Sequence, residues 1–201
     1  MSLTLDVDIP ALAIVPRQRR FSSLSVAGER PSDVWARERL LDEAFGSARH
    51  EKTVERLREG RLPARGLSLV AKDGEDLVGT LRLWHIQAGD VPALLLGPLA
   101  VAKACRSRGL GRKLMAEALL RAASAGHKAV LLVGDAAFYE PFGFSRRHTL
   151  RLSLPGPVDE ARFLGLELKG GALKVARGFV VAAGARDLPA YRGAIAFRRA
   201  A

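Results

Sequence analysis

The sequence contains a single cysteine, Cys105, among its 201 residues. One cysteine cannot form an internal disulfide and cannot supply a cysteine-based metal site. Of the four histidines, His50 and His148 have no companion at the spacing of metal ligands. The sequence therefore predicts no disulfide framework and no bound metal. Cys105 is not expected to be a nucleophile, because that role would require an activating base.

Long hydrophobic runs are also missing. No apolar stretch is long enough to span a bilayer, so no membrane partner is expected. Near the N-terminus, the basic run at 17–20 follows the apolar segment at 3–15, which reverses the order found in a secretory signal. We therefore expect a cytoplasmic protein, and we interpret residues 1–20 as an N-terminal tail or an extra edge piece.

Acidic residues are outnumbered, since 32 Lys and Arg against 21 Asp and Glu leave a net charge of +11. Such a charge favours binding to a nucleic acid, an anionic surface or an acidic ligand. Aromatic residues make up only 6% of the chain and the basic residues are dispersed, so no stacking surface for single strands is apparent. Nucleic acid is therefore not an expected partner, although a basic RNA-associated module remains an alternative.

The most informative stretch covers residues 94–144 and begins with an apolar run at 94–101. A nearly continuous apolar run is typical of a strand covered on both faces. Gly97 and Pro98 interrupt it, and because Pro98 cannot donate to a sheet ladder, we expect a bulge or a splay there. A strand that leaves its neighbour has free backbone groups inside the protein, and a ligand that carries amides could pair with them.

A basic, glycine-containing turn at 106–113 follows, and apolar residues at helical spacing come after it. The turn therefore begins a helix, whose first N–H groups lack internal partners and whose dipole end is positive. Gly109 and Gly111 would let a phosphate reach the backbone. The spacing matches neither a P-loop nor a dinucleotide fingerprint. The turn predicts an anion site, although an ordinary solvated helix cap has the same composition.

The next apolar strand, at 129–133, leads to a short helical segment at 136–142 that carries Phe138, Tyr139 and Phe142. The pattern R-x-x-G-x-G at the head of a helix, followed one strand later by F-Y-E-x-F-G-F, resembles the acetyl-coenzyme A site of the GNAT superfamily of N-acetyltransferases. The resemblance covers residues 67–144. It implies an α/β fold of the α+β type, with a mixed, mostly antiparallel central sheet whose splayed strands are flanked by helices.

The resemblance also implies where acetyl-coenzyme A binds, namely between the diverging strands at 94–101 and 129–133. The pantetheine amides would pair with the backbone of the first strand, and the pyrophosphate would bind the N–H groups of the basic turn. The cofactor-binding residues implied in this way are Leu99, Ala100, Val101, Arg106, Ser107, Arg108, Gly109, Leu110, Gly111, Arg112, Phe138 and Phe142.

The implied reaction is direct transfer of the acetyl group from the thioester to a primary amine, on a small molecule or on a protein. Tyr139 holds the family's general-acid position and would protonate the departing thiolate. Packing on the cofactor is the alternative role of this ring. His85 is a candidate base, although a water chain or simple deprotonation in bulk would also serve. The alternative to an enzyme is a catalytically silent module that binds coenzyme A.

Around this stretch, the sequence predicts a single domain over 21–201, with the motif region at 67–144 and C-terminal strands within 145–201. We expect a first strand at 21–26, helices at 34–45 and 50–59, and a hairpin formed by 66–71 and 77–86. The family resemblance implies that residues 45–50 face the acceptor, although an ordinary turn is the alternative. Further strands are expected at 148–154, 163–168 and 178–183. A homodimer is left open.

Overall fold

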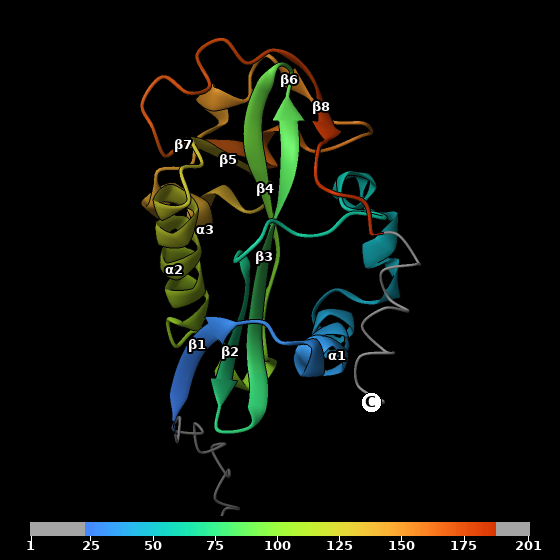
Figure 1. The fold of residues 1–201 in the computed structure, drawn as a ribbon, viewed down its shortest axis with the longest axis vertical. Helices are drawn as coiled ribbons and strands as arrows, with labels where there is room; N and C mark the ends of the chain where they lie inside the picture. The colour runs from blue at the N-terminus through green and yellow to red at the C-terminus, as the bar shows by residue number, and fades with distance from the viewer. Residues whose placement is uncertain (1–22, 188–201) are drawn as a thin grey trace, which may run out of the picture.

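A computed structural model describes residues 23–187, so the tail expected at 1–20 lies outside the described residues. One eight-stranded sheet organises the fold (Figure 1). Across the sheet, the strands follow the order β1 (Leu24–Gly28), β2 (Ser68–Asp73), β3 (Asp76–Ala88), β4 (Val91–Val101), β5 (Ala129–Val133) and β7 (Phe163–Glu167). Strand β8 (Gly178–Ala182) pairs with β3 and with the short β6 (Leu152–Ser153). Most of these neighbours are antiparallel, so the predicted mixed, mostly antiparallel sheet is confirmed.

Two helices cover opposite faces of the sheet (Figure 1). Helix α2 (Leu110–Ser124) buries an apolar stripe at three-to-four-residue spacing against one face, where Leu81 and Leu83 of β3 contact it. Helix α1 (Val34–Phe45) packs Leu40 and Leu41 against Ala100 of β4 on the other face. The helices predicted at 34–45 and after the basic turn are therefore both present.

Strands β4 and β5 are parallel neighbours that separate part of the way along. Their pairing ends at Leu95, whereas β4 continues along β3 as far as Val101. Helix α2 connects the two strands, which is the usual arrangement for a parallel pair. The half of β4 beyond Leu95 is thus paired on one side only, and its other edge is open to a ligand.

A bulge lies where the strands separate. One residue of β3, Arg82, faces two residues of β4, Gly97 and Pro98, between the register pairs on either side. The indole N–H of Trp84 donates a hydrogen bond to the carbonyl oxygen of Gly97 at 2.9 Å, which ties the bulge to the neighbouring strand. The bulge predicted at Pro98 is confirmed, and its cause is the missing proline N–H.

The prediction of a helix at 50–59 is wrong. The structure has two separate 3-10 turns instead, η2 (Ser47–Glu51) and η3 (Thr53–Leu57), with Lys52 in an extended conformation between them. Leu57 is the only side chain of η3 that is buried, so this segment has no continuous apolar face to pack on the sheet. A short helix without such a face is marginal, which explains why the chain breaks it.

The strand predicted at 148–154 is reduced to the two residues of β6. The chain before it forms the 3-10 turn η6 (Arg146–His148), where the Ser145 hydroxyl accepts a hydrogen bond from the Arg147 N–H at 3.3 Å. The buried Thr149 hydroxyl donates to the Phe163 carbonyl at 2.6 Å. Hydroxyl groups that bond nearby backbone compete with sheet formation, and apolar alternation alone does not reveal this.

Asp33 stabilises the 3-10 turn η1 (Pro31–Asp33), which leads directly into α1. Its buried carboxylate accepts the backbone N–H of Arg30 at 2.8 Å and pairs with the Lys72 ammonium at 2.6 Å. The hydrogen bond from Lys72 lowers the pKa of Asp33. A lowered pKa stabilises the fold above the unfolded-state pKa of about 3.9, and the contribution is lost as the pH falls through the folded-state pKa.

We expect Asp33→Asn to lower the free energy of unfolding by about 1–3 kcal/mol at pH 7, because it leaves Lys72 without its partner. The difference from the parent protein should shrink as the pH falls below about 4. Urea unfolding across this pH range measures both effects. Glu43→Gln is the control, since it removes a carboxylate whose pair with Arg39 is exposed and is worth little. Equal effects of the two substitutions would contradict this account of Asp33.

Candidate active site

Two adjoining pockets lie along the open half of β4, and they share Leu99 and Phe138. We call the first the turn pocket, a cavity of about 450 Å³ lined by Leu99, Val101, Cys105, Arg106, Ser107, Gly109, Leu110, Gly111, Arg112 and Phe138. We call the second the inner pocket, a cavity of about 300 Å³ lined by Leu95–Leu99, Val133–Asp135, Phe138, Tyr139, Arg162, Phe45, Arg49, Lys52, Val54, Glu55 and Arg58.

The backbone of the turn pocket is arranged to bind an anion. Ser107 and Gly109 both adopt left-handed conformations, with φ of 57° and 77°, immediately before α2 begins at Leu110. The first N–H groups of a helix have no acceptor within it, and no side chain caps this end of α2. These N–H groups and the positive end of the helix dipole together favour a phosphate.

Gly111 keeps the turn pocket open. A Cβ placed on this residue would lie 3.4 Å from Cζ of Phe138 and 3.8 Å from Cγ2 of Val101, two residues that line the pocket. A side chain at this position would therefore occupy the space between the turn and β4. Arg106 and Arg112 add positive charge to the pocket, and Arg106 Nε donates to the Val101 carbonyl at 3.0 Å.

Three residues from the predicted cofactor set do not line the turn pocket. Ala100 packs its side chain under α1, although its backbone belongs to the open half of β4. Phe142 packs against Phe138, with ring centroids 6.0 Å apart, and so supports the pocket from behind. Arg108 belongs to the same turn but is not among the lining residues. The other residues of the set are brought together as the motif implied.

Tyr139 is held at the end of α3 (Ala136–Tyr139), directly after β5. Its ring packs edge-on against Phe138 and Phe144, at centroid distances of 4.9 and 5.8 Å. A Cβ on Gly134 would lie 2.2 Å from Cε2 of Tyr139, so the ring needs glycine at this position. Burial raises the pKa of Tyr139 to about 12, against a smaller lowering by Arg162. The hydroxyl is therefore neutral at physiological pH and can donate a proton.

The structure does not bring His85 and Tyr139 together. His85 lines a third, separate pocket with His127, and the two imidazole centroids are 5.4 Å apart. Burial, together with the neighbouring His85, lowers the pKa of His127. Within residues 23–187 there is no cluster of three or more His, Cys, Asp or Glu able to hold a metal ion. In the same range, no helix has the length and apolar character needed to cross a membrane.

Sequence reasoning missed most of the inner pocket. It assigned residues 45–50 to the acceptor side, and Phe45 and Arg49 from this segment do line the cavity. It did not identify Lys52, Arg58 or Arg162, which also line it. The density of basic residues between positions 49 and 58 was the available signal, in a segment that the sequence predicted to be a helix.

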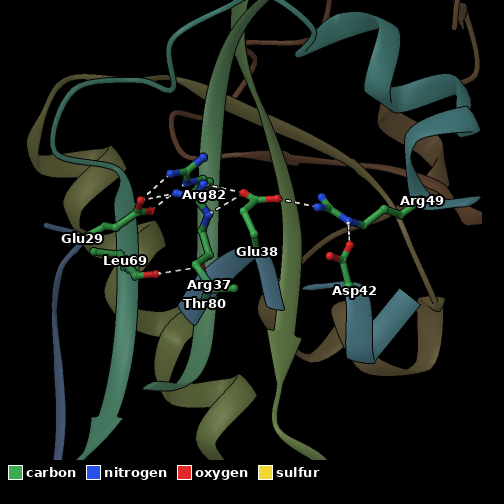
Figure 2. A network of polar contacts seen from close by, with 8 residues as sticks. All are labelled: Glu29, Arg37, Glu38, Asp42, Arg49, Leu69, Thr80 and Arg82. Atoms are coloured by element: carbon green, nitrogen blue, oxygen red, sulfur yellow. Dashed lines mark hydrogen bonds and ion pairs between the residues drawn. The ribbon is translucent and has the colours of Figure 1, made fainter. Parts of the chain in front are cut away.

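Figure 2 shows the polar network that fixes this wall of the inner pocket to the sheet. Its charged members are Glu29, Arg37, Glu38, Asp42, Arg49 and Arg82. Arg37 of α1 pairs with Glu29 and with Glu38, and Arg49 pairs with Glu38 and with Asp42. The network thus runs from the sheet across α1 to η2, and it neutralises the charge of Arg49.

Comparison with known proteins gives one consistent family. A family model described as an acetyltransferase (GNAT) domain matches residues 64–146. The N-acetyltransferase YhbS of Escherichia coli strain K12 is 33% identical over 156 residues, an alignment that covers 76% of this chain and 92% of that protein.

Solved structures agree with this. The crystal structure of E. coli YhbS in complex with CoA superposes with a TM-score of 0.67 at 33% identity, over 80% of this chain and 89% of that one. A GNAT family acetyltransferase from Brucella melitensis, crystallised with acetyl-CoA, superposes with a TM-score of 0.57 at 25% identity, over 73% of this chain and 88% of that one.

Proposed function

Since the chain belongs to the GNAT family of acetyltransferases, we propose that it moves the acetyl group of acetyl-CoA to a primary amine by direct attack, with Tyr139 as the general acid. The observation that carries this proposal is the placement of Tyr139 in the inner pocket, next to the turn pocket. One pocket offers an anion site and the other offers a neutral, buried hydroxyl.

We propose that the turn pocket binds the pyrophosphate of acetyl-CoA. The N–H groups at the start of α2 would donate hydrogen bonds to the phosphate oxygens, and Arg106 and Arg112 would add positive charge beside them. The pantetheine amides would pair with the open edge of β4 between Leu99 and Val101, which β5 leaves free. The thioester would then enter the inner pocket past Leu99 and Phe138, the two residues that both pockets share.

The proposed chemistry has two steps. A neutral amine attacks the thioester carbonyl and forms the new C–N bond, and its surplus proton passes to water. The C–S bond then breaks, and the sulfur takes the proton of the Tyr139 hydroxyl, which is later replaced from solvent. A phenol with a pKa of about 12 keeps this proton until it is needed. Arg162 lowers that pKa and so favours the transfer to sulfur.

The third pocket has no part in this scheme. His85 faces His127 and not Tyr139, so the scheme uses water to accept the amine proton. A buried tyrosine as the acid and water as the base are sufficient to acetylate an amine that is already partly neutral near pH 8.

We expect the purified chain to release free thiol from acetyl-CoA when an acceptor amine is added. A panel of primary amines, followed by mass spectrometry of the products, measures both the rate and the acetylated species. Incubation with acetyl-CoA alone is the control for simple hydrolysis. Tight binding of CoA without thiol release from any amine or protein would support the catalytically silent module instead.

A further inference from the structure

The wall of the inner pocket formed by η2 and η3 is strongly basic. Arg49, Lys52 and Arg58 lie on it, and Arg162 lies on the wall next to Tyr139. Glu55 and Asp135 are the acidic residues of the same lining. Glu55 pairs with Arg58, and Asp135 accepts the Ala137 N–H at the start of α3 but keeps its charge, so two carboxylates stand against four cations. The pocket therefore has positive charge that its own acids do not balance.

Arg58 is the least satisfied of these cations. Its side chain is only 8% exposed, and its Nη2 donates to Glu55 at 2.7 Å. Its Nε is fully buried and has no hydrogen-bond partner among the described residues. Burial lowers the pKa of Arg58, which agrees with a charge that is incompletely compensated. A buried guanidinium N–H without an acceptor is unfavourable, so Arg58 would gain a hydrogen bond if a ligand brought an oxygen against it.

The other cations differ in what they can offer. Arg49 is paired with Glu38 and Asp42 in the network of Figure 2, so it lines the pocket without adding net positive charge. Lys52 has no ion pair among the described residues, and its ammonium lies 4.8 Å from the Phe45 ring centroid. Arg162 likewise has no ion pair within the described part of the chain. Lys52 and Arg162 are thus unpaired within the described part of the chain, whereas Arg58 has one ion pair, with Glu55, and an Nε without an acceptor.

We propose that the acceptor is a small primary amine that also carries a carboxylate, and that Arg58 binds this carboxylate. This inference rests on the proposed acetyl transfer. A guanidinium is well suited to a carboxylate, because its planar N–H groups match the two oxygens. A cavity of about 300 Å³ suits a small molecule. Polyamines and other polycationic acceptors would meet like charge at the same wall and are excluded by it.

Matched acceptors test the proposal. An amino acid and its carboxamide present the same amine and differ in the charged group. We expect kcat/KM for the carboxylate to exceed that for the carboxamide by about 10- to 100-fold, which corresponds to one charge-assisted hydrogen bond. Arg58→Gln should bring this ratio close to one. Arg65→Gln removes an exposed arginine outside the pocket and should leave the ratio unchanged.

Arg58→Lys provides a second variant if Arg58→Gln does not fold. Lysine keeps a cation for Glu55 but has no Nε, so it should also reduce the preference for the carboxylate. Equal rates with the carboxylate and the carboxamide in the parent protein, or the highest rates with polyamines, would overturn the inference and leave acetyl transfer intact.

A binding measurement separates this inference from the proposed function. An N-acetylated amino acid, used as the product probe in the presence of CoA, should raise the melting temperature of the parent protein more than its carboxamide does. Arg58→Gln should abolish that difference. If no amine is acetylated, the proposed function fails, and this comparison still decides whether the pocket binds a carboxylate.

Discussion

Replacing Tyr139 by phenylalanine is expected to lower kcat by about 10²–10⁴-fold, the usual contribution of general acid catalysis. The Kd for acetyl-CoA should hardly change, because the ring that packs against Phe138 and Phe144 is retained. A loss in kcat with constant cofactor affinity identifies an interaction made in the transition state. The measurement is steady-state and single-turnover kinetics, combined with calorimetry for acetyl-CoA.

Gly134→Ala is a matched variant for the same prediction. It keeps the Tyr139 hydroxyl but places a Cβ where the ring now lies, 2.2 Å from Cε2, so the ring must move. We expect kcat to fall here as well, because catalysis depends on the position of the hydroxyl as much as on its presence. If Tyr139 only packs on the cofactor, Tyr139→Phe should be almost silent and Tyr139→Ala should weaken cofactor binding instead.

The pH profile offers an independent check. A general acid acts in its protonated form, which persists below its pKa, and burial raises the pKa of Tyr139 to about 12. The rate should therefore rise as the acceptor amine loses its proton and should then stay level up to about pH 10.5. A fall in kcat with an apparent pKa near 10 would indicate an unburied phenol and would contradict the environment described for Tyr139.

Much of the fold could be predicted because its signals are local. The apolar runs of β4 and β5, the stripe of α2 and the bulge at Pro98 each follow from residues close together in the sequence. The segments at 47–57 and 146–154 could not be predicted in this way. The backbone conformation of these segments depends on packing against other parts of the fold. It also depends on single hydroxyl groups such as that of Thr149, whose hydrogen-bond partner Phe163 lies outside the segment.

The two pockets differ in how well the sequence predicts them, again because one depends on local signals and the other does not. The turn pocket is built largely from one continuous turn, so a motif can identify most of its residues. The inner pocket joins side chains from α1, η2, η3, β4, β5, α3 and the 3-10 turn η7 (Glu160–Arg162). Its special feature, the unsatisfied Nε of Arg58, is a property of burial and not of residue type. Only the folded arrangement distinguishes this arginine from the others in the chain.

Gly111→Ala should raise the Kd for CoA by about 100-fold or more, whereas the free energy of unfolding should stay constant or rise by up to about 1 kcal/mol. The new Cβ would project between Phe138 and Val101 and would keep a phosphate from the N–H groups at the start of α2. Loss of two charge-assisted hydrogen bonds, each worth about 1.5–3 kcal/mol, is sufficient for such an effect. Alanine also favours a helix more than glycine does, so stability and affinity should change in opposite directions.

Calorimetry with CoA and urea unfolding measure the two quantities on the same variant. Gly109→Val is a weaker test, because Gly109 has a φ of 77° and any side chain there is strained whether or not a phosphate binds. Gly28→Ala is the control, since Gly28 lies at the end of β1, has open space around it and needs no left-handed backbone. Unchanged CoA affinity in a folded Gly111→Ala protein would show that the pyrophosphate binds elsewhere, and the turn would then be an ordinary helix cap.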